Sequence, residues 1–133
     1  MRIVVGYDGS DPAKRALQRA ADLAGNEDHM VVVAAAEQHA RTGIETGSHL
    51  DPSEVSQRRG DLEEARRFLS ERGIDAEPIE AQGDPGAVIV EAAKGADLIV
   101  VGSRGVNPVQ RILLGSVSSK VVHRAACDVL VVR

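Results

Sequence analysis

Residues 98–101 read Leu98-Ile99-Val100-Val101, and this aliphatic run ends at Gly102. A short, continuous aliphatic run is typical of a strand that is buried on both faces, as in a parallel sheet covered by helices. The glycine at its carboxyl end would let the backbone approach a ligand closely, because no side chain intervenes. The run therefore predicts an interior strand of an α/β fold with a possible binding site at its end.

Four further strands are predicted on either side of this run. Residues 3–6 and 30–36 are continuous apolar runs, whereas residues 74–81 alternate loosely and contain Pro78. Proline cannot donate a ladder hydrogen bond, so we expect that segment at an edge of the sheet. The last strand is predicted at Val129-Leu130-Val131-Val132.

Four helices are predicted between the strands. Asp11-Pro12, Asp51-Pro52 and Asp84-Pro85 each place a capping carboxylate before a proline in the first helical turn. The fourth helix is expected to begin at Ser116. Residues 37–50 are mostly polar and contain two glycines, and they are expected to form a loop.

Strands that alternate with helices predict an open, doubly wound, five-stranded parallel sheet with helices on both faces, a Rossmann-like α/β fold. The apolar strands at residues 3–6 and 98–101 suit the interior of the sheet, and the strand with Pro78 suits an edge. With the five strands numbered along the chain, this favours the order 3-2-1-4-5. That order places a topological switch point between strands 1 and 4, where open α/β sheets bind ligands. The length of 133 residues predicts a single domain, residues 1–133.

Composition narrows the classes of function. The formal net charge is -4 and no basic stripe is visible, which disfavours a nucleic-acid partner. The longest apolar run, residues 30–36, is too short to cross a bilayer, and the strand pattern starts at residue 3 without a signal-peptide pattern. We therefore predict a cytoplasmic protein with no membrane partner.

Metal and thiol chemistry are not expected. The histidines lack metal-ligand spacing, and Cys127 has no obvious activating base beside it, so neither a metal site nor a catalytic residue is predicted. The four histidines are His29, His39, His49 and His123.

The residues that could bind a ligand lie around the switch point. Asp8 follows strand 1, while Gly102 and Gly105 follow strand 4. Nine residues later, Gly115-Ser116 opens a helix, whose first-turn N–H groups lack intrahelical partners and form an anion site. Taken singly, each glycine is more often a turn residue and the serine a helix cap. Together at one switch point, they favour a cradle for phosphate.

The pattern G-x-x-G, nine residues, then G-[ST] resembles the nucleotide motif of ATP-binding universal stress proteins. Here it stands complete as Gly102, Gly105, Gly115 and Ser116. The resemblance runs the length of the chain, with further matching segments at residues 3–10, 83–85, 96–102 and 114–118.

The resemblance implies ATP as the ligand, with Mg²⁺ held through the phosphates. Asp8 is expected at the ribose or adenine end, Ala35 would offer backbone to the adenine, and Val101 would line the same pocket. The ribose and phosphates are expected along Gly102, Arg104 and Gly105, and the phosphate tail at Gly115, Ser116, Val117 and Ser118. The alternative role for Asp8 is that of a turn residue ahead of the first helix. An aspartate at position 102 or 115 is expected to remove ATP binding while the fold is retained.

The expected function is regulatory ATP binding in a stress response, with slow or no hydrolysis. No G-x-x-x-x-G-K-[ST] sequence is present, and Arg104 and Arg111 are the nearest cations. One alternative is an ATP-dependent enzyme, such as an ATPase or a nucleotidyl or phosphoryl transferase of related fold. Residues 7–10 do not match the S-G-G-x-D-S loop of such enzymes. The other alternative is an interaction module without nucleotide, which the complete motif disfavours.

A homodimer is expected through the strand Val129 to Val132. An apolar edge strand is a pairing hazard unless something covers it, and the resemblance also implies dimers of this kind. A shielded edge and a monomer are the alternative. Two positions depart from the family pattern, with Ala35 where a bulkier aliphatic residue is usual and Asp128 where proline is usual. These departures affect the expected adenine packing and the last strand.

Overall fold

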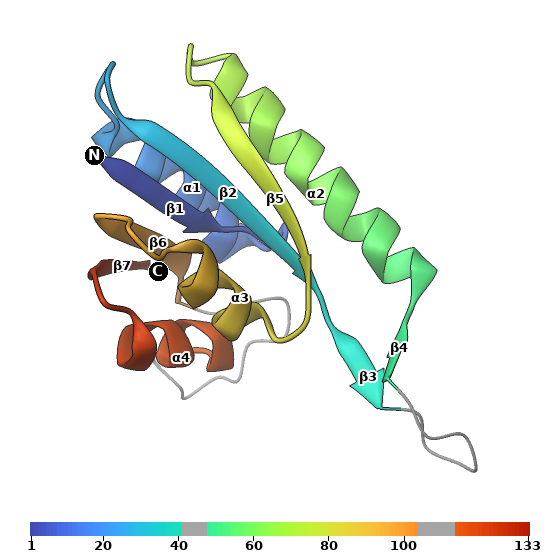
Figure 1. The fold of residues 1–133 in the computed structure, drawn as a ribbon. Coiled ribbons are helices and arrows are strands. Elements are labelled where there is room, and N and C mark those ends of the chain that lie inside the picture. The colour runs from blue at the N-terminus through green and yellow to red at the C-terminus, as the bar shows by residue number, and fades with distance from the viewer. Residues whose placement is uncertain (41–47, 104–113) are drawn as a thin grey trace.

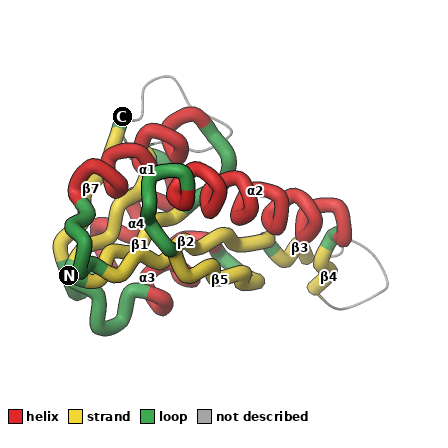
Figure 2. Tube along the Cα trace, turned by 90° about the horizontal axis from the view of Figure 1, so that it is seen from above, coloured by secondary structure: helices red, strands yellow, loops and turns green. Residues whose placement is uncertain are grey.

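The computed structural model describes residues 1–40, 48–103 and 114–133, with residues 38–40, 48 and 49 described by their backbone. It has three layers, a central sheet and helices on each of its faces (Figures 1 and 2). The strands of the central sheet are β1 (Arg2–Gly6), β2 (His29–Ala36), β5 (Ala76–Gln82), β6 (Leu98–Gly102) and β7 (Asp128–Val132). The helices are α1 (Asp11–Leu23), α2 (Pro52–Ser70), α3 (Pro85–Ala92) and α4 (Ser116–Arg124).

The central sheet has the order β5-β2-β1-β6-β7, and all neighbouring strands are parallel. This confirms the predicted order 3-2-1-4-5. The strand with Pro78 lies at one edge, and β7 lies at the other. From β1 the chain adds strands toward one edge of the sheet (β2, β5), and from β6 it adds a strand toward the other edge (β7). The switch point therefore lies between the carboxyl ends of β1 and β6.

The core is split between the two faces of the sheet because successive strand residues face opposite sides. Ile3 and Val5 pack with α1 and α2, whereas Val4 packs with α3 and α4. Figure 2 shows these two pairs of helices on opposite sides of the strands. The core is almost wholly aliphatic, and this explains how a chain with 2% aromatic residues buries a complete sheet.

Three helices are preceded by a residue whose side chain accepts a hydrogen bond from a backbone N–H of the first turn. Asp51 and Asp84 cap α2 and α3 by accepting backbone N–H groups, as predicted. The predicted cap of α1 is wrong by one residue, because Ser10 is the N-cap and accepts from the N–H of Ala13. Asp11 is already the first helical residue.

The expected loop at residues 37–50 is also wrong in part. Residues Gln38–Ala40 (β3) and Ser48–Leu50 (β4) pair as an antiparallel two-stranded sheet, which extends beyond the carboxyl end of β2 (Figure 1). Backbone pairing does not require the apolar alternation by which strands are recognised in a sequence. Three polar-rich residues on each side therefore gave no strand signal. No helix among the described residues is long and apolar enough to cross a membrane.

Candidate functional site

Those predicted site residues that the structure describes lie toward the carboxyl edge of the sheet, where β1 and β6 end and α1 and α4 begin. β1 pairs with β6 through Val5 and Val100, so Asp8, which follows β1, and Gly102, which ends β6, belong to adjacent strands. β2 continues beyond β1, since Gly6 lies opposite Val33. Ala35 lies in this extension of β2, where it pairs with Ala81 of β5.

Asp8 shapes the turn between β1 and α1. Its Oδ1 accepts a hydrogen bond from the Ser10 N–H at 3.0 Å and a second from the Ser10 hydroxyl. Ser10 in turn caps α1. Asp8 therefore acts as a turn residue ahead of the first helix, which was one of the two roles considered for it from the sequence. Both hydrogen bonds use Oδ1 of its half-buried carboxylate.

Helix α2 supports this turn from behind, which the sequence gave no reason to expect. The hydroxyl of buried Tyr7 donates to Glu64 Oε1, and Arg58 Nε lies 3.1 Å from Asp61 Oδ2. Gly9 has φ +77°, and a Cβ built there would lie 2.7 Å from Asp61 Oδ1. The glycine therefore permits both a left-handed turn and close packing against α2.

Electrostatics around Asp61 reflect this crowding. Burial raises the pKa of the Asp61 carboxyl above its ordinary value, although the neighbouring Arg58 guanidinium acts to lower it. The carboxylates of Asp8 and Glu64 raise this pKa further. The negative charges beside the β1–α1 turn are thus close enough to influence one another.

Gly102 is a glycine for a packing reason. A Cβ at this position would lie 2.7 Å from the carbonyl carbon of Pro12, 2.8 Å from Pro12 Cβ and 3.0 Å from the N of Ala13. The first turn of α1 thus occupies the space that a side chain would need. An aspartate at position 102 would meet the same backbone atoms, so we expect it to lower the stability of the fold as well as to remove ATP binding. Val101, one residue earlier, is buried against Ile89 of α3 in the core.

The first turn of α4 faces the same edge. Gly115 is its N-cap, with φ -76° and ψ 174°, and no described side chain caps this helix. The N–H groups of Ser116, Val117 and Ser118 have no intrahelical partner in such a turn. Together with the helix dipole they form a place where an anion is stabilised. Ser116 is exposed and Val117 is half-buried.

A buried hydrogen-bond junction ties this turn to the end of β6. The carbonyl oxygen of Ser103 accepts from the Gly115 N–H and from the Ser118 hydroxyl, the latter at 2.9 Å. The Ser103 N–H donates to the Val132 carbonyl at 2.7 Å, which continues the β6–β7 pairing. Ser118 was expected to offer its hydroxyl to phosphate, but the structure directs that hydroxyl to the main chain.

Two predicted site residues, Arg104 and Gly105, lie outside the described residues, as does Arg111. Their placement stays a prediction. Among the described residues, the start of α1 and the start of α4 thus both contact the end of β6.

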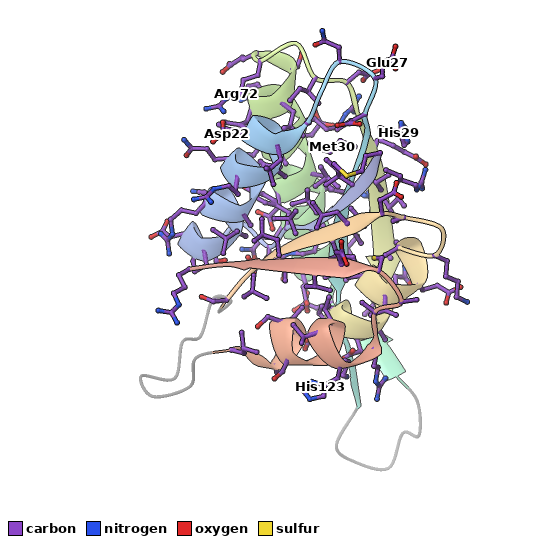
Figure 3. All side chains as sticks on the ribbon, turned by 90° about the vertical axis from the view of Figure 1, so that its left-hand side faces the viewer. Asp22, Glu27, His29, Met30, Arg72 and His123 are labelled. Carbon is purple, nitrogen blue, oxygen red and sulfur yellow. The ribbon has the colours of Figure 1, made fainter. Side chains whose placement is uncertain are left out.

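Charged and imidazole groups elsewhere serve the scaffold. His29 lies at the start of β2, with Nε2 3.0 Å from Glu77 Oε2. The Arg72–Asp22 pair joins the turn after α2 to α1 at 3.4 Å (Figure 3). The Nδ1 of His123 lies 2.7 Å from the Ser119 carbonyl within α4. Among the described residues, no three His, Cys, Asp or Glu side chains are grouped to hold a metal ion.

Comparison with known proteins gives a single, consistent relationship. The model of the universal stress protein family matches residues 1–133. Universal stress protein YxiE of Bacillus subtilis is 35% identical over 145 residues, covering 99% of this chain and 98% of that protein. A universal stress protein from Archaeoglobus fulgidus, solved in complex with dAMP, has a TM-score of 0.78 at 26% identity, covering 100% of this chain and 98% of that one. Another universal stress protein, solved in complex with cAMP, has a TM-score of 0.75 at 28% identity, with 100% and 97% covered. The chain therefore belongs to the universal stress protein family.

Proposed function

We propose that residues 1–133 form one nucleotide-binding domain, which holds ATP at the β1–β6 switch point and acts in a stress response. The observation that carries the proposal is the first turn of α4 at this edge, which has a glycine N-cap, no capping side chain among the described residues, and N–H groups suited to phosphate. The two solved relatives with dAMP and cAMP support an adenine nucleotide as the ligand class. ATP itself is our inference from the complete glycine motif.

The nucleotide is proposed to lie from β2 to α4. The adenine and ribose would meet Asp8, the backbone of Ala35 and Val101, and the phosphate tail would reach the N–H groups of the α4 turn. Mg²⁺ would be held through the phosphates, which carry the negative charge. The full set of contacts is Asp8, Ala35, Val101, Gly102, Arg104, Gly105, Gly115, Ser116, Val117 and Ser118.

We further propose a regulatory role with slow or no hydrolysis. The sequence has no P-loop lysine to reach the β- and γ-phosphates. A steady-state phosphate-release assay tests this point, since efficient turnover would replace the regulatory role with an enzymatic one.

Mg-ATP is expected to stabilise the native chain. A ligand that binds the native state alone adds about 2.7 kcal/mol to the free energy of unfolding at 100 times its Kd. For a domain of this size, that is a rise of several degrees in Tm. The measurement is a thermal melt with and without millimolar Mg-ATP, after mass spectrometry has shown the starting protein to be free of nucleotide. Mg-GTP at equal concentration controls for salt effects, and an unchanged Tm with Mg-ATP contradicts the proposal.

A homodimer through β7 is proposed because the two edges of the sheet differ. The β5 edge carries Pro78 together with Glu77 and Glu80, and such residues oppose strand pairing. The β7 edge carries the half-buried aliphatic residues Val129 to Val132. A second copy offering the same strand antiparallel would cover these side chains in a twofold arrangement.

Val131→Pro is expected to weaken this dimer while the protomer stays folded. The Val132 carbonyl faces β6, where it accepts from Ser103, so strand alternation directs the N–H of Val131 to the open edge. Proline there removes one outward donor. Light scattering behind a sizing column should give twice the chain mass for the wild type and a shift toward 14.1 kDa for the variant. A wild-type mass of one chain at micromolar concentration contradicts the dimer.

A further inference from the structure

Ser103 and Ser118 are the two buried polar residues among the residues for which burial is described. Ser118 is 1% exposed and Ser103 is 5% exposed. Burying a polar group destabilises the fold unless the group is hydrogen-bonded, so these two serines are expected to have specific hydrogen-bond partners. Both lie at the edge where the phosphate tail is proposed to bind.

The geometry joins three segments at one peptide group. Two donors from the start of α4 converge on the Ser103 carbonyl: the N–H of the N-cap Gly115 and the hydroxyl of Ser118 in the first turn. The Ser118 hydroxyl also lies 3.2 Å from the Gly115 carbonyl, and the Ser103 N–H is bonded to Val132 of β7. The first turn of α4 is thus attached at two points to a peptide that the sheet holds in place.

The hydroxyl of Ser118 has one proton, and the main chain uses it. This differs from the role expected from the sequence, in which the hydroxyl donates to phosphate. We infer that Ser118 is a positioning residue whose buried hydroxyl, through the Ser103 carbonyl, fixes the N–H groups of the α4 first turn and thereby sets the affinity for the phosphate tail. The inference rests on the proposed nucleotide site, and it names Ser118 as one residue that determines how strongly this site prefers ATP over AMP.

Position matters because hydrogen bonds to an anion depend steeply on distance and angle. The nucleoside end is proposed to rest on the β1–α1 turn and on β2, which the Ser118 bond does not touch. Loosening α4 should therefore weaken ATP, whose tail reaches the turn, much more than AMP. A residue that only stabilised the fold would weaken both nucleotides by the same factor.

The experiment compares Ser118→Ala, Ser118→Cys and the matched control Ser119→Ala. Cysteine fills the space of the serine side chain with a somewhat larger sulfur atom and donates only weakly, so the hydrogen bond is weakened without opening a cavity. Ser119 lies one position along the same helix, and neither the junction nor the proposed ligand uses its hydroxyl. Isothermal titration with Mg-ATP and with AMP is run for each protein. Hydrogen exchange in the absence of nucleotide reports the protection of the Gly115 N–H and of the first turn.

For Ser118→Ala and Ser118→Cys we expect ATP affinity to fall about 10-fold, AMP affinity to change by less than about 2-fold, and exchange at Gly115 to accelerate. Ser119→Ala should match the wild type. Wild-type ATP affinity in Ser118→Ala, or equal losses for ATP and AMP, overturns the positioning role while the nucleotide site stands. A wild-type chain that binds neither nucleotide overturns the proposed function itself, and with it this inference.

Discussion

Gly115→Asp is expected to abolish ATP binding and at the same time to raise the free energy of unfolding. Gly115 is the N-cap of α4, and its φ of -76° and ψ of 174° suit any L-residue. Aspartate is among the preferred N-cap residues, because its carboxylate accepts N–H groups of the first turn. Those are the groups proposed to bind phosphate. The new carboxylate would therefore occupy the anion site and repel the ligand, while it stabilises the helix by roughly a few tenths of a kcal/mol relative to glycine.

The opposite signs of the two effects make this variant informative. A variant that loses ligand because it is damaged melts earlier, whereas Gly115→Asp should melt later and still fail to bind. Gly115→Asn is the matched control, since it caps about as well as aspartate but carries no charge. We expect similar stabilisation from asparagine and a smaller loss of affinity, both measured by thermal melts and titration with Mg-ATP. Normal ATP binding by Gly115→Asp would place the phosphates elsewhere.

Much of the fold follows from short-range sequence signals. The aliphatic runs at residues 3–6 and 98–101 predicted interior strands, and Pro78 predicted an edge, which together were enough to order the sheet. The hairpin of β3 and β4 could not be predicted in this way, because its strands have three residues each and pair through backbone geometry. Its pairing is a property of two segments brought together, which neither segment reveals alone.

The position of the candidate site could be predicted where it depends only on which residues lie at the ends of strands. Asp8 lies two residues after β1 and Gly102 is the last residue of β6, so the parallel sheet brings both to one edge. The support from α2 was missed because Asp61 and Glu64 look like an ordinary charged helix face. Only the packing of α2 against the turn shows that Glu64 accepts from buried Tyr7.

The reasons for individual residues were harder to predict than their positions. Gly102 lies at the carboxyl end of β6, as the sequence predicted, but the close neighbour that its missing side chain accommodates is α1. Ser118 was expected among the phosphate contacts, yet its hydroxyl bonds to a carbonyl fifteen positions earlier in the chain. Both roles depend on distances between elements, which a sequence motif does not contain.

Gly102→Ala is expected to lower the free energy of unfolding by about 1–3 kcal/mol. The added methyl would meet Pro12 and Ala13 at 2.7–3.0 Å, closer than Cβ atoms approach other heavy atoms in folded proteins. Because two of these neighbours are backbone atoms at the start of α1, they cannot move aside by a rotamer change. The helix start must shift, and with it the Ser10 cap and the turn that carries Asp8. The expected change in Tm is a fall of about 4 °C for each kcal/mol.

Gly60→Ala provides the matched control, since it makes the same chemical change with the opposite expected sign. Gly60 is exposed inside α2, and no heavy atom of the described residues lies within 4 Å of a Cβ built there, apart from its chain neighbours and nearby helix backbone. Alanine should therefore stabilise the helix by about 0.5–1 kcal/mol. Thermal and urea melts of both variants test the pair, with hydrogen exchange at α1 as a local reading. If Gly102→Ala melts at or above the wild-type temperature, α1 does not press on the end of β6. Glycine would then be needed at position 102 for ligand binding and not for packing. In that case Gly102→Ala should bind ATP more weakly without any loss of stability.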